Sequence, residues 1–176
     1  YSNMQSPSSV EGLLKPITPA AAASSDQLPS RSGDIQTELQ RAIRTVLAAV
    51  DNELNSELAM VYLKDRARDE LIAVAATTSF GEELIGVVLP LGARVSGWVA
   101  ANGQAIINTD AALEFPTWSA AENGSVCSAI PIRSSAEIAG VLCVVRSIKK
   151  PFTLDEVKFL ETVCMKFDEP PLRELL

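Results

Sequence analysis

Three cysteines are the most reactive side chains of this sequence. Cys127, Cys143 and Cys164 are widely spaced and form no C-x-x-C pair, so neither a disulfide framework nor a zinc site is indicated. Each lies in an apolar stretch, where a free cysteine commonly acts as a small buried residue. Cys127 could instead serve as a redox sensor or nucleophile, but no Lys, Arg or His adjoins it to lower the pKa of its thiol.

General acid–base chemistry has little support. The chain contains no histidine, which removes the commonest base, metal ligand and proximal haem ligand. Asp155 and Glu156 could be read as paired catalytic carboxylates. However, Thr153 and Glu156 have the spacing of a capping box, and a helix dipole favours Asp155 in a first turn. We therefore expect no enzymatic activity and no metal site, and the sequence assigns no cofactor.

Charge and hydropathy exclude several partners. The net charge is −7, the calculated pI is about 4.7 and no basic stripe occurs, so nucleic acid is not an expected partner. The most apolar stretches, such as 139–145, are too short to cross a bilayer. Unpaired cysteines and the lack of a signal-peptide pattern indicate a cytoplasmic protein without membrane contact in this fragment. Because the sequence opens on Tyr1, we expect a piece of a longer chain.

The chain divides into three segments. Residues 1–33 are rich in Ser, Pro and Ala and have the composition of a linker or tail. Residues 34–168 carry the periodic apolar patterns of one folded domain. Consecutive prolines at 170 and 171 must end the last helix, so 169–176 is interpreted as the start of a following segment, with a separate short helix from Leu172.

Apolar periodicity predicts the elements of the domain. An amphipathic helix is expected at 34–55, capped by Asp34, and a second at 153–167. A short helix capped by Ser96 should end at Asn102-Gly103. The predicted strands are six: 58–64, 71–76, 87–91, 104–108, 126–133 and 138–147. A long structured loop, 109–126, separates the fourth strand from the last hairpin and could act as a lid.

This order of elements resembles the GAF domain, a relative of PAS domains, over residues 34–167. Four local patterns agree: LGARVSGWVA at 91–100, QAIINTD at 104–110, the hairpin SAIPI and IAGVL at 128–132 and 138–142, and PFTLDE at 151–156. The resemblance implies an α+β fold in which a central antiparallel sheet of about five or six strands lies between helical layers.

Specialised branches of the family fit less well. The Cys next to a His that is typical of bilin-binding members is missing, as is the His of haem-binding members. Cyclic-nucleotide-binding members typically carry Asn-Lys after the central hairpin, where this chain has Arg146-Ser147. We therefore expect no useful affinity for cyclic AMP or cyclic GMP. The resemblance implies a sensory module of a bacterial-type signalling protein, with its ligand unassigned.

A ligand pocket in this family lies beneath the long loop. Aromatic walls suit small molecules, so Trp98, Phe115 and Trp118 are candidate lining residues, although all three could simply pack the core. Polar groups that could orient a ligand come from the neighbouring strands, where they could equally be turn or capping residues. The complete candidate set is Trp98, Ile106, Asn108, Asp110, Phe115, Trp118, Cys127 and Ser128.

Three functions follow from these observations. The first is a cytoplasmic sensory and regulatory domain that binds a small ligand, or forms a homodimer through the helices at 34–55 and 153–167, to regulate an attached output domain. The helices carry more apolar positions than one sheet face should need, which favours self-association. The second is a ligand-free dimerisation scaffold. The third is a small-metabolite reductase that uses Cys127.

Overall fold

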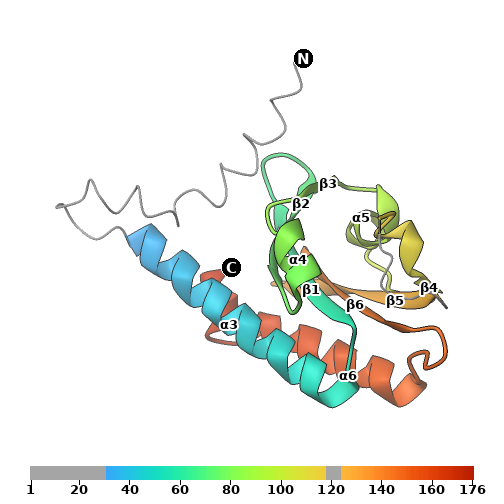
Figure 1. Ribbon diagram of the computed structural model, residues 1–176. Coiled ribbons are helices and arrows are strands. Elements are labelled where there is room, and N and C mark those ends of the chain that lie inside the picture. Colours follow the sequence, from blue (N-terminus) through green and yellow to red (C-terminus); the bar gives the residue numbers. More distant parts are fainter. Residues whose placement is uncertain (1–30, 118–123) are drawn as a thin grey trace.

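A six-stranded antiparallel sheet forms the middle of the structure, in the order β3-β2-β1-β6-β5-β4 (Figure 1). The computed structural model describes residues 31–117 and 124–176. The strand number and antiparallel pairing confirm the predicted α+β fold. The strands are β1 (Leu58–Asp65), β2 (Glu70–Ala76), β3 (Val88–Pro90), β4 (Ile106–Asp110), β5 (Ser125–Ser134) and β6 (Glu137–Ser147).

Helices cover both faces of this sheet. The long helix α3 (Arg31–Leu54) and the helix α6 (Leu154–Met165) lie side by side on one face, while α4 (Ser79–Leu84) and α5 (Arg94–Asn102) lie on the other (Figure 1). Successive strand residues point to opposite faces, so Val61 packs toward α3 and α6 while Met60 and Tyr62 pack toward α5. The chain therefore has two apolar layers.

Local signals explain most element boundaries. The capping box predicted for α6 is present, because the Thr153 side chain accepts from Glu156 N–H and the Glu156 side chain accepts from Thr153 N–H. Gly103 ends α5 in the left-handed region, with φ of 70°, as expected. The β5–β6 hairpin turns at Ser135 and Ala136, both at positive φ.

Three boundary predictions were wrong. Helix α3 begins at Arg31 rather than after Asp34, because helical geometry continues upstream of the apolar pattern. Helix α4 was missed because its six residues are too few for a periodic signal; Thr78 caps it by accepting from Gly81 N–H. Ser96 does not cap α5: Ala93 occupies that position without a side-chain bond, and Ser96 lies buried inside the helix.

The end of the chain folds back onto the domain. After α6 come a 3-10 helix, η5 (Lys166–Asp168), the two prolines and then α7 (Leu172–Leu175), so the predicted break before a separate short helix is confirmed. Leu172 is buried in the same apolar layer as α3, and the C-terminus lies beside α3 (Figure 1). The segment after residue 168 therefore contributes to the domain core.

Candidate ligand site

The candidate residues from the sequence are divided between the two faces of the sheet. Ile106, Phe115 and Cys127 belong to the apolar layer beneath α5. Ser128 follows Cys127 in strand β5, so its side chain points to the opposite face. Its hydroxyl accepts a hydrogen bond of 3.0 Å from Asn108 N–H. The described members of the set therefore do not line one common cavity, and their role in ligand binding stays a prediction.

Asn108 joins the edge strand β4 to the loop before α6. It adopts a positive φ of 54° at a register irregularity in the β4–β5 pairing. Its side chain donates from Nδ2 to Phe152 O and accepts at Oδ1 from Phe152 N–H, both at 2.9 Å. Asn108 thus satisfies both backbone groups of one residue far away in sequence.

The remaining candidates have diverse positions. Trp98 lies on α5 with 39% of its surface exposed. Asp110 caps the 3-10 helix η4 (Ala111–Leu113) by accepting from Ala112 N–H, which is the turn-capping role weighed for it. Phe115 is buried and makes an edge-to-face contact with Phe80. Trp118 lies outside the described residues.

A buried carboxylate, which sequence reasoning missed, lies in the layer beneath α5. Glu114 follows η4 and is fully buried. Its Oε2 accepts a 2.7 Å bond from the Tyr62 hydroxyl, and its Oε1 accepts a 2.8 Å bond from Ser96 N–H. No ion pair reaches Glu114 among the described residues. Both oxygens accept, as the oxygens of an ionised carboxylate do.

The N-terminus of α5 explains why this carboxylate is tolerated. The first turn of a helix presents unpaired N–H groups and the positive end of the helix dipole. Ala93 supplies no capping side chain, and Glu114 caps the first turn of α5 from another part of the chain through Ser96 N–H. The Ser96 hydroxyl is also buried there, beside the Cys143 thiol. The site therefore combines a charged acceptor with a buried hydroxyl.

Two side chains near Glu114, those of Tyr62 and Cys143, have raised pKa values. Burial, followed by the nearby Glu114 charge, raises the pKa of the Tyr62 hydroxyl well above its usual value. The Cys143 thiol also has a raised pKa, first because of its hydrogen bond with Cys127 and then because of burial. Both cysteines are fully buried and unpaired. The Cys143 thiol is therefore held in its unreactive protonated form, because the thiolate is the nucleophile.

The backbone is strained where α5 begins. Arg94, the first residue of α5, has a positive φ of 56°, a conformation that costs a non-glycine residue roughly 1 kcal/mol or more. Its guanidinium donates to Glu114 O at 3.3 Å. Arg94 thus binds the backbone carbonyl of Glu114, while Ser96 and Tyr62 bind the Glu114 carboxylate.

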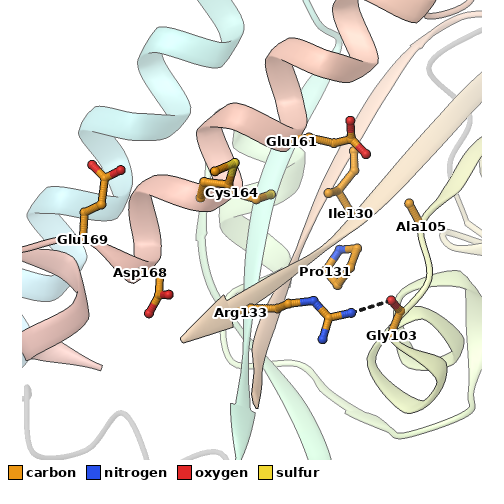
Figure 2. Close-up of a pocket in the computed structure, with 10 residues that line it drawn as sticks. Gly103, Ala105, Ile130, Pro131, Arg133, Glu161, Cys164, Asp168 and Glu169 are labelled. Atoms are coloured by element: carbon orange, nitrogen blue, oxygen red, sulfur yellow. Dashed lines mark hydrogen bonds between the residues drawn. The ribbon is translucent and has the colours of Figure 1, made fainter. Parts of the chain in front are cut away.

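A separate cavity opens on the opposite face of the sheet, between β5 and α6 (Figure 2). Its volume is about 530 Å³, within the range of small-molecule sites. Arg133 crosses it and donates to Gly103 O at 2.7 Å. Carboxylates of Glu161, Asp168 and Glu169 surround it. None of the candidate residues that the structure describes lines this cavity.

The helical layer on this face is joined to the sheet by one arginine that the sequence also did not reveal. Arg146 on β6 is 3% exposed. It pairs with Glu156 at the start of α6, donates to Leu54 O at the end of α3, and stacks over the Phe152 ring with its guanidinium carbon 4.5 Å from the centroid. The ends of two helices and one strand therefore share a single cation.

Within the described residues, 31–117 and 124–176, no group of three or more metal-ligating side chains gathers. None of the helices in these ranges combines the length and hydropathy that a membrane crossing requires.

The signals for the Glu114 site were weak. Tyr62 interrupts an apolar strand, and a buried tyrosine hydroxyl usually finds a partner, which could have prompted a search for an acceptor. Glu114 lies between Leu113 and Phe115 in a loop of irregular pattern. Nothing in the order of residues indicates that this carboxylate turns inward, because its partners come from distant elements.

Comparison with known proteins gives a consistent family. The family model described as GAF domain matches residues 36–166. The GAF domain of a phosphoenolpyruvate-protein phosphotransferase from Acinetobacter is 17% identical, with a TM-score of 0.59 over 80% of this chain and 92% of that chain. The GAF-B domain of DevS from Mycobacterium smegmatis is 19% identical, with a TM-score of 0.57 over 72% and 87%.

An enzyme shares the same fold. The type II free methionine-R-sulfoxide reductase from Thermoplasma acidophilum is 11% identical, with a TM-score of 0.60 over 80% of this chain and 93% of that chain. At these identities each structure establishes a common fold. No curated protein matches the chain.

Proposed function

The chain belongs to the GAF domain family, and we propose that it is the cytoplasmic sensory and regulatory domain of a signalling protein, binding a small ligand beneath α5. GAF domains are typically modules of this kind. The observation that carries the proposal is Glu114, a fully buried carboxylate without an ion-pair partner among the described residues. A buried charge is costly unless it is compensated, so a ligand that compensates this carboxylate would stabilise the domain.

The chemistry of the site favours a ligand that donates hydrogen bonds. Glu114 and the buried Ser96 hydroxyl offer acceptors, while Ile106, Phe115 and Cys127 supply apolar surface in the same layer. The other sequence candidates, Trp98, Asn108, Asp110, Trp118 and Ser128, remain proposed ligand residues. A ligand with an ammonium or amide group would compensate the Glu114 charge.

Native mass spectrometry of the full chain tests this proposal. We expect a retained mass beyond that of the polypeptide, which is lost in Glu114→Gln and kept in the exposed control Glu53→Gln. A chain purified from cytoplasm that carries no added mass, and that gains none from a metabolite extract, would favour the ligand-free scaffold instead.

We further propose that the domain is not an enzyme. The reductase alternative requires Cys127 as a thiolate, whereas Cys127 and Cys143 are both fully buried and no Lys, Arg or His adjoins Cys127 in the sequence. We expect no reduction of free methionine sulfoxide in the presence of dithiothreitol. Product formation that Cys127→Ser abolishes would establish the reductase and overturn this part of the proposal.

A second means of regulation is self-association. We propose that the chain forms a homodimer, as the sequence predicted from the helices at 34–55 and 153–167. The apolar sides of both helices pack into the chain's own core, with Ile43, Leu47 and Leu160 fully or almost fully buried. An association must therefore use other sides of these helices. The specific observation in its favour is that α6 leaves Leu154 and Met165 exposed.

A further inference from the structure

Helix α6 carries a row of exposed side chains whose order is self-complementary. Leu154 and Met165 are the two most exposed large apolar side chains of the described residues, at 71% and 65%. They are eleven positions apart, which is close to three full turns, so they lie on the same side of the helix. Lys158 and Glu161 are also exposed and lie between Leu154 and Met165 on the same side of helix α6. We call these four residues the α6 row.

The spacing within the α6 row is symmetric. Lys158 follows Leu154 by four residues, and Met165 follows Glu161 by four. When a second copy is placed antiparallel about a two-fold axis, Leu154 lies opposite Met165 of the second copy, and Lys158 lies opposite Glu161 of the second copy. A two-fold interface requires this kind of self-complementary surface. Neither charge is used within the chain, because no ion pair of the described residues includes them.

The charges beyond both ends of α6 follow the same polarity. Before the helix, Lys149 and Lys150 are exposed beside Ile148, which is 51% exposed. After the helix, Asp168 and Glu169 line the cavity (Figure 2), although Asp168 also lies 3.7 Å from the Arg173 guanidinium of the same chain. An antiparallel pair brings the basic end of one copy to the acidic end of the other, and it also aligns the two helix dipoles favourably.

The cavity extends the surface that a second copy can bury. A three-turn helix is only about 16 Å long, and a specific interface usually buries about 800 Å² on each partner. Glu161 and Met165 of the α6 row also line the cavity of about 530 Å³ beside α6. The basic end of the second copy, with the apolar Ile148 and Leu154, therefore meets a hollow lined by three carboxylates and by Arg133, whose guanidinium is bonded to Gly103 O.

We propose that two copies of this chain associate antiparallel through the α6 row, with Lys158 of each paired with Glu161 of the other. This inference rests on the self-association proposed above and names its surface and register. It does not depend on the ligand proposal, because the α6 row and the Glu114 site lie on opposite sides of the sheet.

Charge reversal tests the register directly. Sedimentation equilibrium of the full chain should give a dimer. Lys158→Glu and Glu161→Lys should each weaken it about 10-fold or more, since two like-charge contacts arise by symmetry. The double variant Lys158→Glu/Glu161→Lys should regain the affinity of the parent chain. An equimolar mixture of the two single variants should form heterodimers, because opposite charges then meet at both contacts.

The control is Arg66→Glu, which makes the same charge change as Lys158→Glu on the exposed β1–β2 turn. It should leave the dimer unaffected. All substituted residues are exposed, so circular dichroism should report an unchanged fold. A monomer at all concentrations up to about 1 mM would overturn both the self-association and its surface. A dimer that responds equally to Lys158→Glu and Arg66→Glu, or a double variant without recovery, would overturn only the α6 register.

Discussion

At the scale of single residues, two charged side chains, Arg146 and Glu114, are buried, and their charges are compensated in different ways. Arg146 is surrounded by a carboxylate and backbone carbonyls. Glu114 has two hydrogen-bond donors and the end of a helix dipole. The first arrangement contains a full counter-charge and the second does not. Arg146 therefore belongs to the architecture, whereas Glu114 is the candidate for function.

The two donors of Glu114 define a stability prediction. Glu114→Ala leaves the Ser96 N–H and the Tyr62 hydroxyl buried without acceptors, and we expect it to lower the free energy of unfolding by about 2–4 kcal/mol. Glu114→Gln keeps an acceptor for Ser96 N–H, and the Tyr62 hydroxyl can rotate to accept, so a loss below about 1.5 kcal/mol is expected. Urea denaturation measures both. Equal losses in the two variants would contradict this hydrogen-bond account.

The pair of Arg146 and Glu156 gives a prediction about pH. Its hydrogen bond with Arg146 lowers the pKa of Glu156 from 4.5 to about 2. A depressed carboxyl pKa adds stability that is fully present above about pH 4.5 and is lost as the pH falls toward 2. The difference in unfolding free energy between the parent chain and Glu156→Gln should therefore be constant above pH 5 and shrink below it.

The neighbouring acid supplies the control for this measurement. Asp155 is exposed in the same first turn of α6 but makes no ion pair among the described residues. Asp155→Asn should change stability by only a few tenths of a kcal/mol at pH 7, whereas Glu156→Gln should cost about 2–4 kcal/mol because Arg146 is left buried without its partner. Denaturation curves from pH 3 to 7 compare the two variants.

At the scale of elements, β4 is bound to the helical layer through Asn108. The strand lies at the edge of the sheet and pairs only with β5. Its irregular register at Asn108 lets one side chain bind both backbone groups of Phe152, and Phe152 lies under Arg146. Strand β4 is thus connected through defined contacts to the segment that precedes α6.

Substitutions at Asn108 separate its bonds from its backbone conformation. Asn108→Ala removes both bonds to Phe152 and places an alanine at positive φ, so we expect a loss of about 2–3 kcal/mol. Asn108→Gly removes the same bonds but accepts the conformation freely, so it should be about 1 kcal/mol less destabilising. Thermal or urea unfolding distinguishes them. If the alanine and glycine variants are equally stable, the positive φ contributes no strain.

At the scale of the whole molecule, the end of the chain determines how a signal could leave the domain. Helix α6 is not continued as a rod, since η5 and two prolines separate it from α7. Because α7 places Leu172 in the core beside α3, helices α3 and α7 are packed against each other. We expect output to pass through the relative docking of these parts and not through one continuous helix.

The double substitution Pro170→Ala/Pro171→Ala tests this route. Removing both prolines permits a helix to continue from α6 through residues 169–171, which would withdraw Leu172 from the core. We expect higher helicity by circular dichroism, a less stable domain and altered output in the full-length protein. Leu172→Ala is the control, because it should destabilise by about 2–4 kcal/mol without a gain in helicity. Unchanged helicity and unchanged output in the double variant would make the break incidental.

The sequence by itself determined the parts of this protein that depend on neighbours along the chain. Periodicity located α3, α6 and the hairpins, the Thr153 and Glu156 spacing fixed the start of α6, and Pro170-Pro171 fixed its end. The order of these elements was sufficient to indicate the GAF family. Each of these signals acts within a few residues, so the linear sequence contains it.

The composition of the sites was decided by the tertiary structure. Glu114 meets Tyr62 and Ser96 across intervals of 52 and 18 residues, and Arg146 reaches Leu54 across 92. The residue types alone allowed too many such pairings to choose among. The irregular register at Asn108 accompanies the bonds between its side chain and the backbone of Phe152. Side-chain direction in a sheet depends on register, and register is a property of paired strands that only the folded chain possesses.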